Sequence, residues 1–170
     1  MNCLVSVEGP RGVGKTPLVE RLKDIGFQEP PWLFHPKEMI EKYSEELRDA
    51  IPGTAGNAGI EALIYSNCFF MKDIRLIFDK GFLSSIFYDP RLFRFIRHWI
   101  NLLGKWDNAI VICLDNNAKN PEKGENDESF RKFRRLYKAV PEDLRLYYTI
   151  ENYESDWLEN LIKRIRIRIK

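Results

Sequence analysis

The chain has 170 residues, of which 44% are hydrophobic and 31% charged, and its formal net charge is +2. These values are typical of one globular domain and exclude a disordered chain. No apolar run approaches the roughly 20 residues that a membrane-spanning helix needs, and the opening sequence MNCLVSVEG leads directly into a glycine-rich loop. We therefore expect a cytoplasmic protein with no membrane partner.

Strand-like and helical segments alternate along the chain. Strand-like runs lie at 3–9, 25–28, 75–81, 109–116 and 144–152, the second of them weak. Helical patterns lie at 14–24, 36–50, 60–73, 90–104, 128–139 and 155–170. This alternation predicts an α/β fold of three layers, with a mostly parallel five-stranded sheet between helices. No linker divides the chain, so we expect a single domain over residues 1–170.

Residues 9–16 read GPRGVGKT and complete the pattern G-x-x-x-x-G-K-T, directly after a predicted strand and directly before a predicted helix. Glycines let successive backbone N–H groups point at an anion, and the amino end of the helix adds its dipole. Lys15 would reach the β- and γ-phosphates, and the Thr16 hydroxyl is placed for Mg²⁺. The alternative is a glycine-rich turn that binds nothing. We expect ATP, or else GTP, with Mg²⁺, bound by Gly9, Gly12, Val13, Gly14, Lys15, Thr16 and Pro17.

The later segments narrow the class of P-loop protein. A switch GTPase would carry N-K-x-D and D-x-x-G, and the sequence contains neither. The order EGPRGVGKT, QEP, FDKGFLSSIFY and ENDESFRKFRRLY instead resembles the thymidylate kinase family of nucleoside monophosphate kinases. This resemblance covers most of the chain. It implies a P-loop kinase fold and transfer of the γ-phosphoryl group of ATP to a nucleotide-type acceptor.

The same resemblance implies roles for individual residues. Asp79 would end a strand beside the P-loop and hold Mg²⁺ together with Thr16. Lys80 stands where the family has an arginine near the transferred phosphoryl group, and Arg11 stands where thymidylate kinases usually carry an acidic residue. These two cations would neutralise the negative charge of the phosphoryl group during its transfer. The acceptor would be bound by Ser84, Ser85 and Tyr88, and by Tyr65, Phe69 and Lys72 from an earlier helix.

Each of these assignments has a simpler structural alternative. Asp79 could cap a turn, the serine pair could cap a helix, and aromatic residues at helical spacing are more often part of a core. The charged loop 116–127 resembles the lid of these kinases, which would bring cations to the transferred group and exclude water. The expected lid cations are Lys119, Lys123, Arg131 and Arg134, with a solvated helix face as the alternative.

Glu29 separates two kinds of acceptor. The segment EPPW that contains it also resembles deoxynucleoside kinases, in which a glutamate takes the proton of the sugar 5′-hydroxyl. A nucleoside acceptor needs such a base, whereas a monophosphate acceptor is already an anion. Gln28, Asn67 and Cys68 stand where thymidylate kinases carry acceptor-side polar residues, including two arginines, and this difference weakens dTMP as the acceptor.

The sequence therefore predicts an ATP- and Mg²⁺-dependent kinase of a deoxynucleoside monophosphate, with dTMP favoured. Its catalytic residues would be Lys15, Asp79, Lys80, Arg11 and Glu29. One alternative is a deoxynucleoside kinase, and a second is a polynucleotide 5′-hydroxyl kinase that uses the basic carboxy-terminal helix. A third is a P-loop protein that binds nucleotide without transfer. The expected partner is a nucleoside or nucleoside monophosphate, a homodimer is allowed, and nucleic acid enters only with the second alternative.

Overall fold

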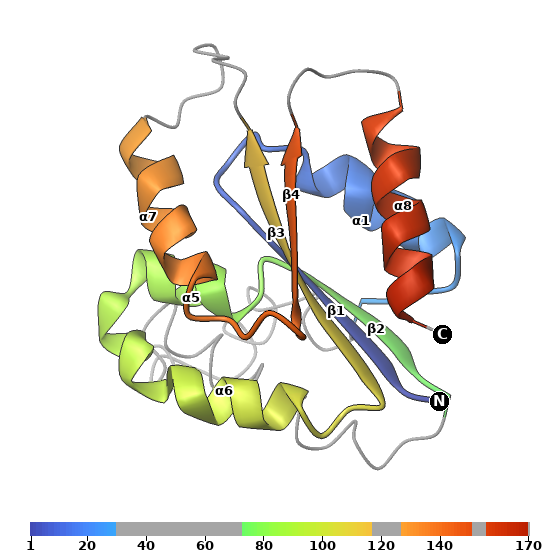
Figure 1. Cartoon of the computed structure of the whole chain (residues 1–170), viewed down its shortest axis with the longest axis horizontal. Helices are drawn as coiled ribbons and strands as arrows, with labels where there is room; N and C mark the ends of the chain where they lie inside the picture. Colours follow the sequence, from blue (N-terminus) through green and yellow to red (C-terminus); the bar gives the residue numbers. More distant parts are fainter. Residues whose placement is uncertain (30–72, 117–126, 151–155, 170) are drawn as a thin grey trace, which may run out of the picture.

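The computed structural model describes residues 1–29, 73–116, 127–150 and 156–169 (Figure 1). The predicted helix 36–50 and nearly all of the predicted helix 60–73 lie outside these residues. So do three predicted acceptor-site residues and two predicted lid cations, which are Tyr65, Phe69, Lys72, Lys119 and Lys123. No helix in the described part of the chain is both long enough and apolar enough to cross a membrane.

A parallel sheet forms the middle layer of the fold. Its strands are β1 (Cys3–Glu8), β2 (Arg75–Asp79), β3 (Asn108–Asn116) and β4 (Arg145–Ile150). The strands lie in the order β2-β1-β3-β4, and all three neighbouring pairs are parallel. The strand that precedes the P-loop is therefore central, and the carboxyl ends of all four strands meet at one edge of the sheet.

The prediction of five strands is wrong for the described residues, because the sheet has four. In place of the predicted strand 25–28, Gln28 alone forms a β-bridge with Leu76 at the outer side of β2. Its N–H donates to the Arg75 carbonyl at 3.0 Å. Pairing is restricted on both sides of Gln28: Gly26 has a left-handed φ of 95°, and the next residue but one is the proline Pro30, which has no N–H to donate.

Helices cover both faces of the sheet, as the sequence predicts (Figure 1). On one face lie α1 (Lys15–Asp24) and α8 (Trp157–Arg168). On the other face lie α5 (Phe82–Tyr88), the 3₁₀ helix η3 (Pro90–Phe95), α6 (Ile96–Leu103) and α7 (Asp127–Tyr137). The single helix predicted at 90–104 is thus two helices of different type.

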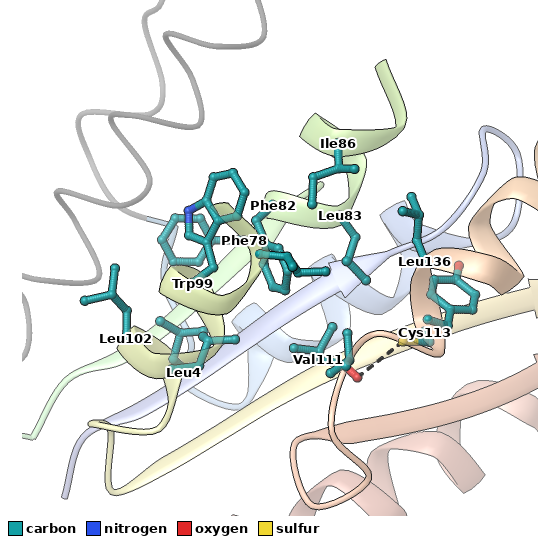
Figure 2. Packing of buried hydrophobic residues seen from close by; sticks show 14 of the residues in the cluster. Leu4, Phe78, Phe82, Leu83, Ile86, Trp99, Leu102, Val111, Cys113 and Leu136 are labelled. Atoms are coloured by element: carbon teal, nitrogen blue, oxygen red, sulfur yellow. Dashed lines mark hydrogen bonds between the residues drawn. The ribbon is translucent and has the colours of Figure 1, made fainter. Parts of the chain in front are cut away.

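Alternating side chains of the strands supply the two cores that hold these layers together. Leu4 and Val111 point to the core under α5, α6 and α7, whereas Val5 and Ile112 point to the core under α1 and α8. Figure 2 shows the first core, in which the ring of Trp99 stacks on Phe82 with 5.5 Å between ring centroids. Because both faces of β1 and β3 are buried, these strands are apolar on successive residues. The two cores fix the carboxyl edge of the sheet, where the predicted P-loop begins.

Candidate active site

The P-loop backbone connects the end of β1 to the start of α1. Gly9, Gly12 and Gly14 have positive φ angles of 154°, 80° and 99°. At Gly9 a side chain is also excluded by space, because an added Cβ would lie 2.8 Å from Val13 Cγ1 and 2.9 Å from the Leu114 carbonyl oxygen. Glycine at these positions lets the loop fold tightly around the amino end of α1.

Lys15 lies inside this loop. The residue is 7% exposed, and its ammonium group donates hydrogen bonds to the carbonyl oxygens of Gly9 at 2.7 Å and Pro10 at 2.6 Å. The loop backbone thus brings a positive charge to the same place as the amino end of α1. This combination of a helix terminus, loop amides and an ammonium group is suited to a polyphosphate.

A cavity of about 730 Å³ opens above the P-loop at the carboxyl edge of the sheet. It brings together residues from the P-loop, from α1, from the end of β2 and from α5. Five predicted site residues that the structure describes are not part of its lining: Val13 and Ser85, which are buried, and Glu29, Arg131 and Arg134. The lining residues are Gly9, Arg11, Gly12, Gly14, Lys15, Thr16, Pro17, Asp79, Lys80, Ser84 and Tyr88.

Asp79 and Thr16 offer oxygen ligands to this cavity. Asp79 ends β2 and stands opposite Val7 of β1 in the register of the sheet. Loss of surrounding water raises the pKa of the Asp79 carboxyl above its ordinary value, and the charges of Lys80 and Lys15 oppose that rise. Mg²⁺ is commonly held by one or two protein oxygens together with substrate phosphates, so this carboxylate and hydroxyl fit a Mg²⁺–ATP complex.

Lys80 has an unusual backbone conformation. Its φ is 67°, in the left-handed region that residues with a side chain rarely adopt, and its N–H donates to the Val7 carbonyl oxygen at 3.1 Å. Lys80 directly follows Asp79 and lines the cavity, so the residue with this strained backbone is a cation at the cavity wall. Strained residues of this kind concentrate at functional sites.

Glu29 follows the bridge residue Gln28 and is not part of the cavity lining. Its carboxylate forms an ion pair with Lys23 of α1 at 2.8 Å, and its side chain is 21% exposed. Hydrogen bonds to Glu29 and Glu20 raise the pKa of Lys23 above its ordinary value. Glu29 is also near enough to Asp79 for its negative charge to add to the rise in the pKa of that carboxyl. The β-bridge at Gln28 fixes this neighbourhood, because it aligns the segment with β2.

The sequence analysis missed Glu8, which is completely buried at the end of β1. Its carboxylate accepts hydrogen bonds from the Ser6 hydroxyl at 2.9 Å and the Leu83 N–H at 3.2 Å. It also accepts two from Ser84, through the N–H at 2.9 Å and the hydroxyl at 2.6 Å. Burial raises the pKa of the Glu8 carboxyl, and these hydrogen bonds oppose the rise. A single glutamate at the end of an apolar strand was the signal in the sequence.

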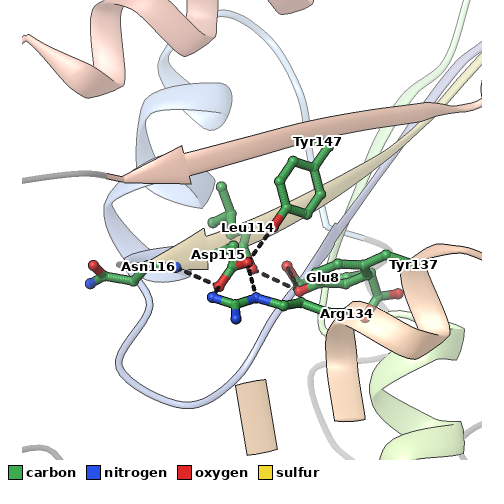
Figure 3. Close-up of polar contacts among 7 residues, drawn as sticks. All are labelled: Glu8, Leu114, Asp115, Asn116, Arg134, Tyr137 and Tyr147. Carbon is green, nitrogen blue, oxygen red and sulfur yellow. Dashed lines mark hydrogen bonds and ion pairs between the residues drawn. The ribbon is translucent and has the colours of Figure 1, made fainter. Parts of the chain in front are cut away.

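A second polar group lies at the end of β3 (Figure 3). Asp115, which is 2% exposed, accepts hydrogen bonds from the Tyr147 hydroxyl and from both ends of the Arg134 guanidinium, one of them at 3.0 Å. Arg134, a predicted lid cation, is therefore tied to the sheet in this structure. Arg131, another predicted lid cation, is exposed on α7. The Tyr137 hydroxyl donates to the Leu114 carbonyl oxygen at 2.7 Å and packs beneath the P-loop.

The comparison with solved structures identifies a protein of the same architecture. The structure of deoxyadenosine kinase from M. mycoides with bound dATP superposes with a TM-score of 0.55, covering 96% of this chain and 99% of that chain. The chain has a P-loop kinase fold. Sequence identity between the two is 15%, so the likeness concerns the fold. It does not single out the thymidylate kinase family. No protein-family model matches the sequence, and no curated protein sequence matches it.

Proposed function

We propose that this protein is an ATP- and Mg²⁺-dependent kinase that transfers the γ-phosphoryl group to a nucleoside-type acceptor. The observation that carries the proposal is the cavity, which gathers the P-loop, Lys15, Asp79 and Lys80 at one edge of the sheet. The P-loop kinase fold supports it, because the likeness spans nearly the whole of both chains. The strained cation Lys80 at the wall of the same cavity also supports the proposal.

The residues of the chain have distinct roles in this proposal. The loop amides and Lys15 hold the donor phosphates, and Thr16 and Asp79 hold the metal ion. Mg²⁺ supplies charge neutralisation and orientation of the phosphates when it is bound. Lys80 and Arg11, both at the cavity wall, stabilise the charge that spreads over the transferred group. Catalysis then comes from positioning and from electrostatics.

We favour a deoxynucleoside as the acceptor, and Glu29 as its general base. Glu29 is near enough to Asp79 for its charge to act on that carboxyl, and its ion pair with Lys23 holds the Glu29 carboxylate in place. A sugar hydroxyl must lose its proton as it attacks phosphorus, and a carboxylate can take that proton. The similarity to a deoxyadenosine kinase is consistent with such an acceptor.

A deoxynucleoside monophosphate such as dTMP is the second candidate. The cavity lining contains three cations, Arg11, Lys15 and Lys80, against one carboxylate, Asp79. This excess of positive charge would accommodate an acceptor that is itself an anion. A monophosphate acceptor would make Glu29 dispensable, because its attacking oxygen is already deprotonated.

The decisive experiment measures ADP release with ATP and Mg²⁺ against deoxynucleosides, deoxynucleoside monophosphates and a 5′-hydroxyl oligonucleotide. Lys15→Ala should abolish turnover, and Glu142→Gln, an exposed carboxylate away from the cavity, should leave it unchanged. If deoxynucleosides react and Glu29→Gln lowers kcat by about a hundredfold or more, Glu29 is the base. Turnover on monophosphates that survives Glu29→Gln would establish the second candidate. ATP binding without turnover on any acceptor would overturn the kinase proposal.

A further inference from the structure

The segment that follows α5 combines positive charge with exposed aromatic rings. Residues 90–106 contain three arginines, one lysine and one histidine, and neither aspartate nor glutamate. Phe93 and Phe95 are 48% and 42% exposed, and Tyr88, at the end of α5, is 60% exposed. We call Tyr88, Phe93, Arg94, Phe95 and Arg97 the basic aromatic surface. Several exposed aromatic rings within one basic segment are a candidate for a ligand-binding surface.

The helix geometry gathers the cations. A 3₁₀ helix repeats every three residues, so Arg91 and Arg94 of η3 lie on the same side, and Arg97 follows one turn later. By the same repeat, Phe93 and Phe95 lie on either flank of this row of arginines. Asp89 already pairs with Arg91, through two hydrogen bonds of 2.8 Å to its guanidinium. In contrast, Arg94 and Arg97 form no ion pair with any residue that the structure describes. These two cations remain available for an anionic ligand.

One aromatic ring, that of Phe95, is held next to these cations. The Arg94 guanidinium lies over the ring of Phe95, 4.7 Å from its centroid. The ring of Phe95 meets the buried Trp99 edge to face, with 6.4 Å between centroids, so its orientation is supported from below. Arginine beside an exposed, oriented ring is the arrangement on which unpaired bases stack while their phosphates are neutralised.

We propose that the basic aromatic surface binds single-stranded nucleic acid. Phosphates would contact Arg94 and Arg97, and bases would stack on Phe93 and Phe95. Tyr88 belongs both to this surface and to the lining of the cavity, so the two sites adjoin. The proposal does not depend on the kinase activity, because it rests on the surface alone.

Charge and geometry favour this ligand over other occupants. A second copy of the chain in a two-fold interface centred on this surface would place each arginine cluster against the same cluster of its partner, which is repulsive. A duplex hides the faces of its bases and would leave the phenyl rings unused. The basic helix α8 is a weaker candidate. Its Arg168 donates to the Arg145 carbonyl oxygen, its Arg164 stacks over Tyr148, and its exposed apolar residue is the aliphatic Ile167.

The test is fluorescence anisotropy of a labelled single-stranded oligonucleotide of about 12 nucleotides, titrated with protein in the absence of ATP. Arg94→Glu with Arg97→Glu should weaken binding at least about tenfold and reduce the slope of log affinity against log salt by about 1.4. Phe93→Ala with Phe95→Ala should weaken binding about thirtyfold or more with little change in that slope.

The matched control reverses two charges on the opposite face of the sheet, Lys163→Glu with Arg166→Glu on α8, and should leave binding within about twofold of wild type. Thermal unfolding of each variant verifies that it is folded. The proposal is overturned if a duplex binds as tightly, if the α8 variant loses as much affinity, or if no oligonucleotide binds at low salt. It is also overturned if the protein binds anionic lipid vesicles but no oligonucleotide, and the same substitutions abolish the vesicle binding.

The kinase assay keeps this inference apart from the proposed function. The Arg94→Glu/Arg97→Glu variant should retain wild-type turnover on the small-molecule acceptor, because neither residue lines the cavity. Conversely, Lys15→Ala should bind the oligonucleotide as wild type does. Nucleic-acid binding without kinase turnover would support the nucleic-acid proposal and refute the proposed kinase activity. Kinase turnover without nucleic-acid binding would support the kinase activity and refute the nucleic-acid proposal.

Discussion

Ser84 donates both its backbone N–H and its hydroxyl to the carboxylate of Glu8, across 76 residues of sequence. Glu8 is the residue directly before the P-loop, and Ser84 is in the first turn of α5 at the cavity wall. This contact therefore joins the donor side of the cavity to the wall opposite. The buried carboxylate is fully occupied, because each of its oxygens accepts two hydrogen bonds.

Replacing Glu8 by glutamine should destabilise the fold. The amide NH₂ of glutamine would face at least one of the N–H or O–H donors that now serve the carboxylate. A buried donor left without an acceptor costs about 1–3 kcal/mol, so urea denaturation should show a loss of that size in the free energy of unfolding. Glu142→Gln, at a carboxylate that is 93% exposed, is the control. Equal stability of the two variants would show that the Glu8 hydrogen bonds do not stabilise the protein.

The same residue predicts a pH dependence. Burial raises the pKa of Glu8 in the folded protein above the unfolded value of about 4.3. The folded state then holds the proton more tightly, so this group favours folding below that value, and its contribution is lost as the pH rises through the folded pKa. The stability of wild type relative to Glu8→Gln should therefore be greater at about pH 5 than at about pH 8. A difference that is constant, or that grows with pH, would contradict the raised pKa.

Glycine at position 9 is predicted to be required for two separate reasons. Gly9→Ala adds a Cβ that meets the Val13 side chain and the Leu114 carbonyl oxygen, and it strains a φ of 154°. Gly26→Ala is the matched control, because its φ of 95° is strained but an added Cβ would meet only an arginine nitrogen at 4.0 Å. We expect Gly26→Ala to cost about 1–2 kcal/mol of unfolding free energy and Gly9→Ala distinctly more. Thermal unfolding ranks the two variants, and the reverse order would refute the packing argument.

Two substitutions of Lys80 distinguish the effect of its backbone strain on stability from the effect of its charge on turnover. Lys80→Gly and Lys80→Ala both remove the cation from the cavity, so both should lose turnover on the best acceptor. Only glycine tolerates the φ of 67°, so the glycine variant should be about 1 kcal/mol more stable than the alanine variant. Urea denaturation of the two variants measures this difference. If the alanine variant is equally stable, the left-handed conformation stores no strain.

Local patterns in the sequence predicted much of this architecture. The phosphate loop was predictable because its glycines, lysine and flanking elements are adjacent in sequence, and the α/β class followed from alternating patterns. The reduction of the predicted strand 25–28 to a single bridge at Gln28 was not predictable, because pairing there depends on how the segment aligns with β2. Likewise, Glu8 accepts hydrogen bonds from Ser84, and Asp115 accepts one from Tyr147. These partners are far away in the sequence, so no spacing pattern predicts the contacts.

The central place of β1 also has a consequence for how the chain folds. Its residue Cys3 pairs with Arg75 on one side and with Asn108 on the other, so neither edge is satisfied by a neighbouring hairpin. Sheets built from such distant pairs fold slowly, because the chain must close long loops before any pairing is gained. During synthesis β1 leaves the ribosome long before its partner strands exist, and its unpaired backbone edges and apolar side chains stay open to other chains. We expect the yield of soluble protein to depend on what shields that strand until residues 108–116 have been made.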